Sequence, residues 1–186
     1  MANRKLYKIG LTGGMGSGKS SILRYIKDQF GDHVNTLDLD TFAHKIYAMD
    51  SWTIRNLKHC FGRGVTFQNP ENDGQDVINR KYLARTAFRN EYGTTCFRNI
   101  VSPGIRELIF NYFEQYQRDL DSGRSSKQLV VAEGATLVES GTFKFFDELW
   151  VVTLDKSSAF MRVKMRNPEL TDSEIQRRLE LQISDQ

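Results

Sequence analysis

The sequence predicts an α/β protein with a parallel sheet, into which a helical lobe is inserted. Strand-sized apolar runs alternate with helix-like periodic segments near both ends of the chain. A glycine-rich turn follows the first of these runs, and residues 51–123 show a helical pattern without a strong strand signal. The 186 residues are enough for one hydrophobic core with such an insertion.

The first part of the chain reads as a strand–helix–strand unit. Its predicted elements are a strand at 8–12, a glycine-rich loop at 13–18, a helix at 19–30, a strand at 34–38 and a helix at 41–49. The second strand ends in acidic residues, and Asp40 or Thr41 is the expected N-cap of the helix that follows. This alternation is typical of a parallel sheet.

The rest of the chain returns to the same pattern after the helical lobe. The lobe is expected to be interrupted at 68–75 and 102–104, after which strands are predicted at 129–132 and 149–154, and helices at 157–166 and from Thr171 through Gln182. Thr171 and Glu174 have the spacing of a capping box at the start of the last helix. We therefore predict a core formed by residues 1–50 and 124–186, with a lid around 160–182 and a lobe at 51–123.

Composition excludes several classes of protein. With 39% hydrophobic residues and three prolines, the chain is neither disordered nor collagen-like. It contains no apolar run long enough to cross a bilayer, and strand-like residues begin too early to leave room for a cleavable leader. Cys60 and Cys96 form no CxxC pair, so neither a disulfide framework nor a cysteine zinc site is expected. These features favour a cytoplasmic protein, and a net charge of +3 does not indicate nucleic-acid binding.

A complete phosphate-loop pattern carries the first functional prediction. It comprises Gly13, Gly14, Met15, Gly16, Ser17, Gly18, Lys19 and Ser20, and it stands between a predicted strand and a predicted helix. In this pattern backbone N–H groups surround the phosphates, Lys19 meets the β/γ oxygens and Ser20 holds Mg²⁺. ATP or another nucleoside triphosphate is the implied ligand, and the alternative is a glycine-rich turn without a ligand.

The phosphate loop does not by itself separate a kinase from a GTPase or a mechanical ATPase. No guanine-reading Asn-Lys-x-Asp sequence is present, which argues against the commonest GTPase class. The long lobe after the second strand is better explained as a domain that binds an acceptor. A phosphotransferase is therefore favoured.

Three acidic residues lie at or just after the ends of predicted strands near this loop. Asp38 and Asp40 come at the end of the second strand, at the sheet edge where open α/β folds bind ligands. Asp38 is the candidate catalytic base, whereas Asp40 has a mixed role, because it is also a candidate helix cap. Glu133 follows the strand at 129–132, where it would order Mg²⁺ through water, and a surface glutamate is the alternative.

Arginines near the end of the chain are candidates for a lid. Arg162 and Arg166 are four residues apart and so share one helix face. A closing lid would bring them to the transferring phosphoryl group, and a solvated basic face is the alternative. In the lobe, the cations that would meet an anionic acceptor are Arg80, Lys81, Arg85 and Arg89, again with a plain surface role as the alternative.

Together these residues resemble the dephospho-CoA kinase family over nearly the whole chain. The segment Leu11–Ser20 is similar to the family's opening, and Asp38-Leu39-Asp40 to its Asp-x-Asp. The stretch 137–141 resembles its Leu-Leu-x-Glu, the stretch 79–83 resembles the start of its CoA-domain helices, and Arg162, Arg166, Arg178 and Gln182 match its lid positions.

This resemblance implies a P-loop NTPase three-layer fold, with a helical CoA lobe and a lid. The implied reaction is ATP-dependent phosphorylation of the ribose 3′-hydroxyl of dephospho-CoA, with Mg²⁺ as cofactor. The implied roles are Asp38 as base, Lys19 and Arg162 at the transferring group, Arg166 at ATP, and Asp40, His44, Arg80 and Glu139 at the acceptor. The chain departs from the family at Ser102 and at Ala135-Thr136.

The resemblance also implies a difference at the end of the chain. The family continues past the position of Gln186 through another arginine, a fifth strand and a loop near adenine. Two other functions therefore stay open, namely another small-molecule or nucleoside kinase and a non-catalytic ATP-binding module.

Overall fold

The computed structural model describes residues 5–39, 41, 51–68 and 76–181. The chain divides into two compact units, one formed by residues 1–40 with 106–186 and the other by residues 41–105. The sequence analysis places these boundaries elsewhere, at 50/51 and 123/124. The second boundary differs because one continuous helix belongs to both units.

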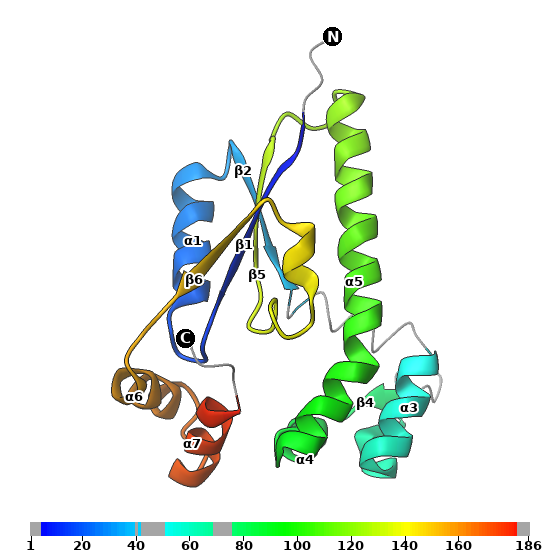
Figure 1. The fold of residues 1–186 in the computed structure, drawn as a ribbon, viewed down its shortest axis with the longest axis vertical. Coiled ribbons are helices and arrows are strands. Elements are labelled where there is room, and N and C mark those ends of the chain that lie inside the picture. Colours follow the sequence, from blue (N-terminus) through cyan, green and yellow to red (C-terminus); the bar gives the residue numbers. More distant parts are fainter. Residues whose placement is uncertain (1–4, 40, 42–50, 69–75, 182–186) are drawn as a thin grey trace. The chain divides into compact units, whose positions relative to one another are not determined.

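A four-stranded parallel sheet organises the first unit. The strand order is β2-β5-β1-β6, and the strands are β1 (Tyr7–Gly13), β2 (Val34–Asp38), β5 (Leu129–Glu133) and β6 (Glu148–Val152). β1 and β5 lie in the middle and carry fully buried residues such as Leu11 and Val130. The α/β fold class and the parallel sheet are therefore confirmed (Figure 1).

Helices cover both faces of this sheet. Helix α1 (Lys19–Phe30) packs Ile22, Leu23 and Ile26 against Ile9 and Val131 of the sheet. On the opposite side, the last part of helix α5 (Glu91–Asp121) buries Ile109 and Leu120 (Figure 1). The result is the three-layer arrangement that the sequence analysis expects.

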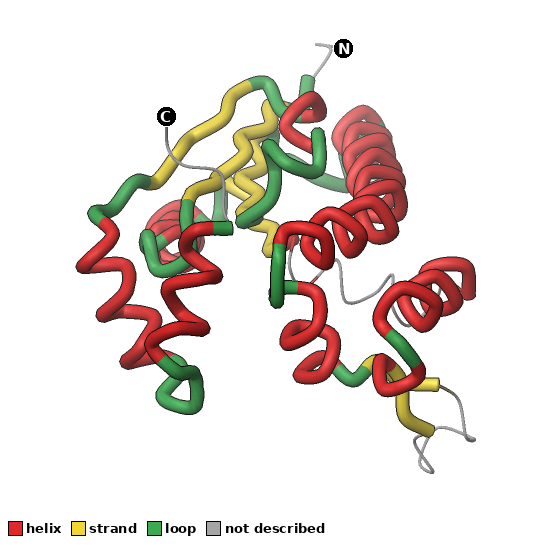
Figure 2. The backbone as a smooth tube through the Cα atoms, turned by 60° about the horizontal axis from the view of Figure 1, so that its bottom comes forward, coloured by secondary structure: helices red, strands yellow, loops and turns green. Residues whose placement is uncertain are grey.

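Two short helices form a hairpin after β6. Figure 2 shows α6 (Lys156–Arg166) beside α7 (Asp172–Glu180). The Asp155 carboxylate caps α6 by accepting from the Ser158 N–H at 2.8 Å. The Ser157 hydroxyl and then this N–H hold the pKa of Asp155 well below its usual range. The predicted capping box at Thr171 and Glu174 is present at the start of α7.

The second unit contains a small hairpin as well as helices. Its elements are α3 (Ser51–Phe61), the 3-10 turn η1 (Arg63–Val65), β3 (Thr66–Gln68), β4 (Asp76–Ile78), α4 (Arg80–Ala87) and the first part of α5. β3 and β4 pair antiparallel, which corrects the expectation of a lobe without strands. Strands of three residues are too short to show an alternating pattern in the sequence.

Helix α5 continues through Pro103, so the predicted interruption at 102–104 is wrong. Proline lacks the backbone donor and costs about 3 kcal/mol inside a helix. Residues around it are nevertheless packed in the interior, because Val101 is 2% exposed, Ser102 is 6% exposed and Ile109 is fully buried. Burial on this scale offsets the cost of one proline, since each large apolar side chain contributes about 1.5–3 kcal/mol. Tertiary packing therefore overrides the local helix-breaking signal.

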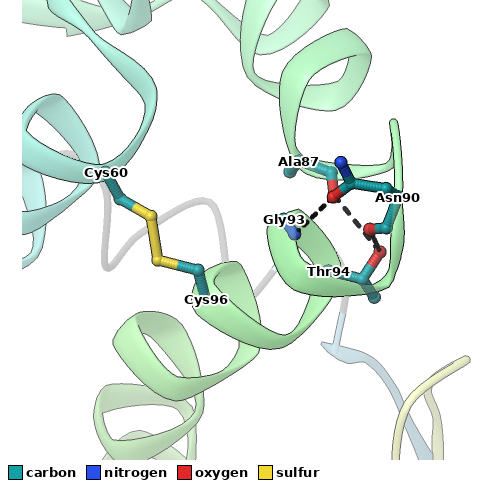
Figure 3. The surroundings of a disulfide bond; sticks show 6 residues. All are labelled: Cys60, Ala87, Asn90, Gly93, Thr94 and Cys96. Carbon is teal, nitrogen blue, oxygen red and sulfur yellow. Dashed lines mark hydrogen bonds between the residues drawn. A yellow bond between two sulfur atoms is a disulfide. The ribbon is translucent and has the colours of Figure 1, made fainter.

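A disulfide joins Cys60 of α3 to Cys96 of α5, whereas the sequence analysis expects no disulfide framework (Figure 3). Both residues pack against the same core, which includes Leu57, Leu83 and Val101. Sequence spacing could not predict this pairing, because 36 residues separate the cysteines and only the packing of the two helices brings their sulfurs together.

Oxidation of this cysteine pair should stabilise the protein. A crosslink that closes a loop of this length lowers the entropy of the unfolded chain. It typically raises the free energy of unfolding by about 2–4 kcal/mol. We expect the oxidised protein to melt at a higher temperature than the reduced one, in calorimetry with and without dithiothreitol. The Cys60→Ser/Cys96→Ser variant serves as control, and its melting temperature should not respond to reductant. Equal melting temperatures for oxidised and reduced wild type would contradict this expectation.

No helix among the described residues has the length and the apolar character that crossing a lipid bilayer requires.

Candidate functional site

The glycine-rich loop lies between β1 and α1, as predicted, and it has an unusual backbone. Gly13, Gly16 and Gly18 have positive φ values of 140°, 81° and 109°. Residues other than glycine rarely adopt positive φ values. The Lys19 Nζ donates to the carbonyl oxygens of Gly13 at 2.8 Å and Gly14 at 2.9 Å, so the lysine folds back over the loop.

Helix α6 packs directly on this loop. A Cβ atom at Gly16 would lie 2.8 Å from the carbonyl oxygen of Ala159 and 3.1 Å from Val163 Cγ2. Both distances are too short for ordinary contact, so only glycine fits there. The close approach places the start of the helical hairpin against the loop.

A pocket of about 740 Å³ opens beside the loop. It is lined by the loop residues 15–18, the start of α1 and part of the helical hairpin, and its cations are Lys19, Arg162, Arg166 and Arg178. The N-terminus of α1 adds positive potential from the helix dipole. Among the described residues that line the pocket there is no carboxylate. Its charge and its backbone donors suit a polyphosphate.

Ser17 provides a second sign of an anionic ligand. Its side chain lies in the loop and is 6% exposed. Within the part of the chain that the structure describes, Ser17 Oγ has no hydrogen-bond partner. A buried hydroxyl without a partner costs free energy, and a phosphate oxygen in the pocket would supply one.

The acidic residues meet at the carboxyl edge of the sheet. Asp38 of β2 and Glu133 of β5 are register partners on neighbouring strands. Glu133 is 6% exposed, so the alternative of a surface glutamate is wrong. Its Oε1 accepts a hydrogen bond from Ser20 Oγ at 2.8 Å, which connects the end of β5 to the start of α1. Asp38 is exposed at the same edge.

Arg162 already reaches the loop from α6. Its Nη1 lies 3.4 Å from the Ser17 carbonyl oxygen and 3.5 Å from that of Gly16, at the long end of the hydrogen-bond range. Arg166 lies one turn further along the same helix, and Arg178 comes from α7. The helical hairpin therefore gathers three arginines at one pocket.

The remaining predicted residues are less completely placed. Glu139 lies in the turn after β5, in the same unit as the loop. Arg80 is the first residue of α4 in the other unit. Asp40, His44 and Gln182 fall outside the described residues.

Sequence reasoning missed four residues that line the pocket, namely Ser21, Ile22, Val163 and Asn167. Asn167 directly follows α6, at the end of the helix that carries Arg162 and Arg166. Its position directly after Arg166 was the available signal. Among the described residues, no three His, Cys, Asp or Glu side chains form a metal cluster. A cation at this site would therefore depend on Ser20, Glu133 and the bound phosphates.

Comparison with known proteins identifies similar chains. A family model described as dephospho-CoA kinase matches residues 7–186. The dephospho-CoA kinase of Dehalococcoides mccartyi is 30% identical over 177 residues, which cover 95% of this chain and 81% of that protein. The dephospho-CoA kinase of Geobacter sulfurreducens is 32% identical over 175 residues, covering 94% and 81% respectively.

Two solved structures are also similar. A protein from Thermus thermophilus superposes with a TM-score of 0.67 at 23% identity, covering 96% of this chain and 81% of that one. A dephospho-CoA kinase from Campylobacter jejuni gives a TM-score of 0.53 at 24% identity, covering 95% and 80%. At such identities the likeness shows a shared fold.

Proposed function

The chain belongs to the dephospho-CoA kinase family, and on that premise we propose that it phosphorylates the ribose 3′-hydroxyl of dephospho-CoA with ATP. The reaction forms a bond between the 3′-oxygen and the γ-phosphorus and breaks the bond to ADP. The hydroxyl proton must leave the acceptor as this bond forms. The catalytic requirements are therefore a cradle for the triphosphate, a positioned base and cations for the transferred charge.

The cationic pocket at the glycine-rich loop is the observation that carries this proposal. Lys19 and the backbone N–H groups of the loop hold the β and γ phosphates. The Lys19 ammonium donates to two loop carbonyl oxygens, so its charge is held at the pocket. Little reorganisation is then needed when the nucleotide binds.

Asp38 is the proposed general base. It is exposed at the sheet edge next to Glu133, whereas Glu133 is buried and engaged by the Ser20 hydroxyl. An exposed carboxylate can reach an acceptor hydroxyl, orient it and accept its proton. The burial and hydrogen bond of Glu133 favour a supporting role for that residue.

The Ser20 hydroxyl and the Glu133 carboxylate fit the family's Mg²⁺. Both offer oxygen atoms, the donors that this hard cation prefers, and Ser20 Oγ lies 2.8 Å from Glu133 Oε1. Ser20 would hold the ion directly and Glu133 through water. When bound, the ion neutralises charge on the phosphates.

Four residues are proposed to contact the acceptor. Glu139 follows β5 and Arg80 begins α4, and the family resemblance assigns both of them, together with Asp40 and His44, to the acceptor. Arg80 would contribute positive charge toward the anionic acceptor.

Removal of the hairpin arginines should lower the rate of phosphoryl transfer. We expect Arg162→Ala or Arg166→Ala to reduce kcat by a factor on the order of ten to a thousand, because these cations act as charge redistributes in the transition state. Steady-state kinetics with dephospho-CoA measure this effect. Arg177→Ala on α7 is the control, because Arg177 is not among the described residues that line the pocket. A wild-type kcat in both Arg162→Ala and Arg166→Ala would mean that the hairpin arginines form a solvated helix face without a role in phosphoryl transfer.

An acceptor screen tests the proposed reaction itself. ADP formation is followed with dephospho-CoA, with a panel of nucleosides and with no acceptor, and the product is identified by mass spectrometry. We expect turnover with dephospho-CoA, and none with the nucleosides or without an acceptor. Turnover with nucleosides would indicate another small-molecule kinase. Tight ATP binding without any turnover would instead indicate a nucleotide-binding module.

A further inference from the structure

The turn between β5 and the 3-10 segment η3 (Thr142–Phe145) has an ordered hydrogen-bond network. Ser140 is 5% exposed, and its hydroxyl donates to the Thr136 carbonyl oxygen at 2.6 Å. Thr142 is fully buried, and its hydroxyl lies 2.8 Å from that of Ser140. Gly141 has a φ of 71°, and its N–H donates to the Val138 carbonyl oxygen at 3.0 Å. These contacts define the path of the turn that carries Glu139.

A side chain of helix α5 donates a hydrogen bond to the backbone of this turn. Arg106 Nη1 donates to the Ser140 carbonyl oxygen at 2.8 Å, across a sequence separation of 34. The guanidinium makes a charge-assisted hydrogen bond to the backbone directly after Glu139. Arg106 and Ser140 both belong to the first unit.

The same face of α5 also contacts the segment after the turn through aromatic side chains. Phe110 and Phe113 lie four and seven residues after Arg106, and this spacing places all three on one helix face. Phe110 lies 6.3 Å from Phe145, and Phe113 lies 5.5 Å from Phe146, measured between ring centroids. The aromatic pairs secure residues 145–146, whereas Arg106 secures the turn itself.

We propose that Arg106 is a positioning residue, which orients the turn carrying Glu139 for binding of the acceptor. This inference rests on the proposed function, because Glu139 is assigned there to the acceptor. The aromatic contacts remain when the guanidinium is lost, so the fold is preserved and only the turn gains freedom. Acceptor binding then weakens while ATP binding and phosphoryl transfer are retained.

Kinetics of Arg106→Gln test this role. We expect KM for dephospho-CoA to rise about tenfold, a size typical of one charge-assisted hydrogen bond, while kcat and KM for ATP stay within about twofold. Arg106→Lys keeps the charge and one donor and should recover part of the loss. Arg118→Gln on the same helix is the matched control, because the Arg118 guanidinium donates to Gln115 three residues earlier on that helix. This variant should behave as wild type.

Proteolysis supplies a readout that does not depend on turnover. A protease that cleaves after glutamate should cut at Glu139 faster in Arg106→Gln than in wild type, with the melting temperature little changed. Phe110→Leu should lower the melting temperature without changing KM for dephospho-CoA. Should Arg106→Gln be too unstable, Arg106→Met keeps the apolar stem and is measured in its place.

The possible outcomes separate this inference from the proposed function. If wild type phosphorylates dephospho-CoA but Arg106→Gln has an unchanged KM for it, Arg106 has no positioning role. The inference would also be overturned if Arg106→Gln lowered both kcat and the melting temperature without a selective rise in KM for dephospho-CoA. If wild type itself does not phosphorylate dephospho-CoA, the proposed function fails, and the role of Arg106 at an acceptor fails with it.

Discussion

Lys19→Ala should abolish most turnover while leaving the fold intact. The Lys19 ammonium donates to the loop carbonyl oxygens of Gly13 and Gly14, and the side chain lines the pocket rather than a hydrophobic core. Its charge stabilises the β/γ phosphates as negative charge redistributes. Loss of such a group costs about a hundredfold to a thousandfold in kcat. Steady-state kinetics with dephospho-CoA measure the loss of kcat.

Lys27→Ala is the matched control for this variant. Lys27 is an exposed cation in the last turn of the same helix, away from the loop. We expect it to retain wild-type kcat. Calorimetry should give both variants nearly the wild-type melting temperature, because neither lysine is part of a buried cluster. An unchanged kcat in Lys19→Ala would mean that the loop does not bind a triphosphate as proposed.

Asp38→Asn should lower kcat by at least about a hundredfold, with little change in ATP affinity. The substitution keeps the size of the side chain but removes the charge that accepts the acceptor proton. Asp38 stands at the end of β2 and is the register partner of Glu133 on the neighbouring strand. ATP affinity should be preserved because the residues that line the pocket come from the glycine-rich loop, α1 and the helical hairpin. Kinetics with saturating Mg²⁺ and a separate ATP-binding titration distinguish these effects.

Asp28→Asn provides the comparison for Asp38→Asn. Asp28 is an exposed carboxylate on α1, outside the pocket lining, and its loss should not change kcat. Near-normal turnover in Asp38→Asn would transfer the role of base to Asp40 or Glu133. Loss of ATP binding in this variant would instead assign Asp38 to the nucleotide.

Short-range patterns predicted most elements of the first unit. The strand, loop and helix at residues 7–30 are present, and the capping box of α7 connects residues only three apart. Glycine spacing also predicted the backbone of the phosphate loop, because positive φ values restrict the residue type locally. Such features depend on neighbours in the chain, so the sequence expresses them directly.

Several expectations failed where packing competes with local preference. Pro103 lies inside α5 because buried neighbours on both sides compensate for the missing donor. The strands β3 and β4 are stabilised by pairing with each other rather than by a pattern within either one. Cys60 and Cys96 are brought together by the packing of α3 and α5.

The sequence by itself determined which residues could bind a triphosphate, since a phosphate loop is a local motif of residues 13–20. Only the tertiary structure decided which partners meet that loop. Ser20 reaches Glu133 across 113 residues, and Arg162 reaches the Ser17 carbonyl oxygen across 145. Contacts over such separations depend on strand order, register and helix packing. These are set by burial of the whole core, which no short segment of the chain encodes alone.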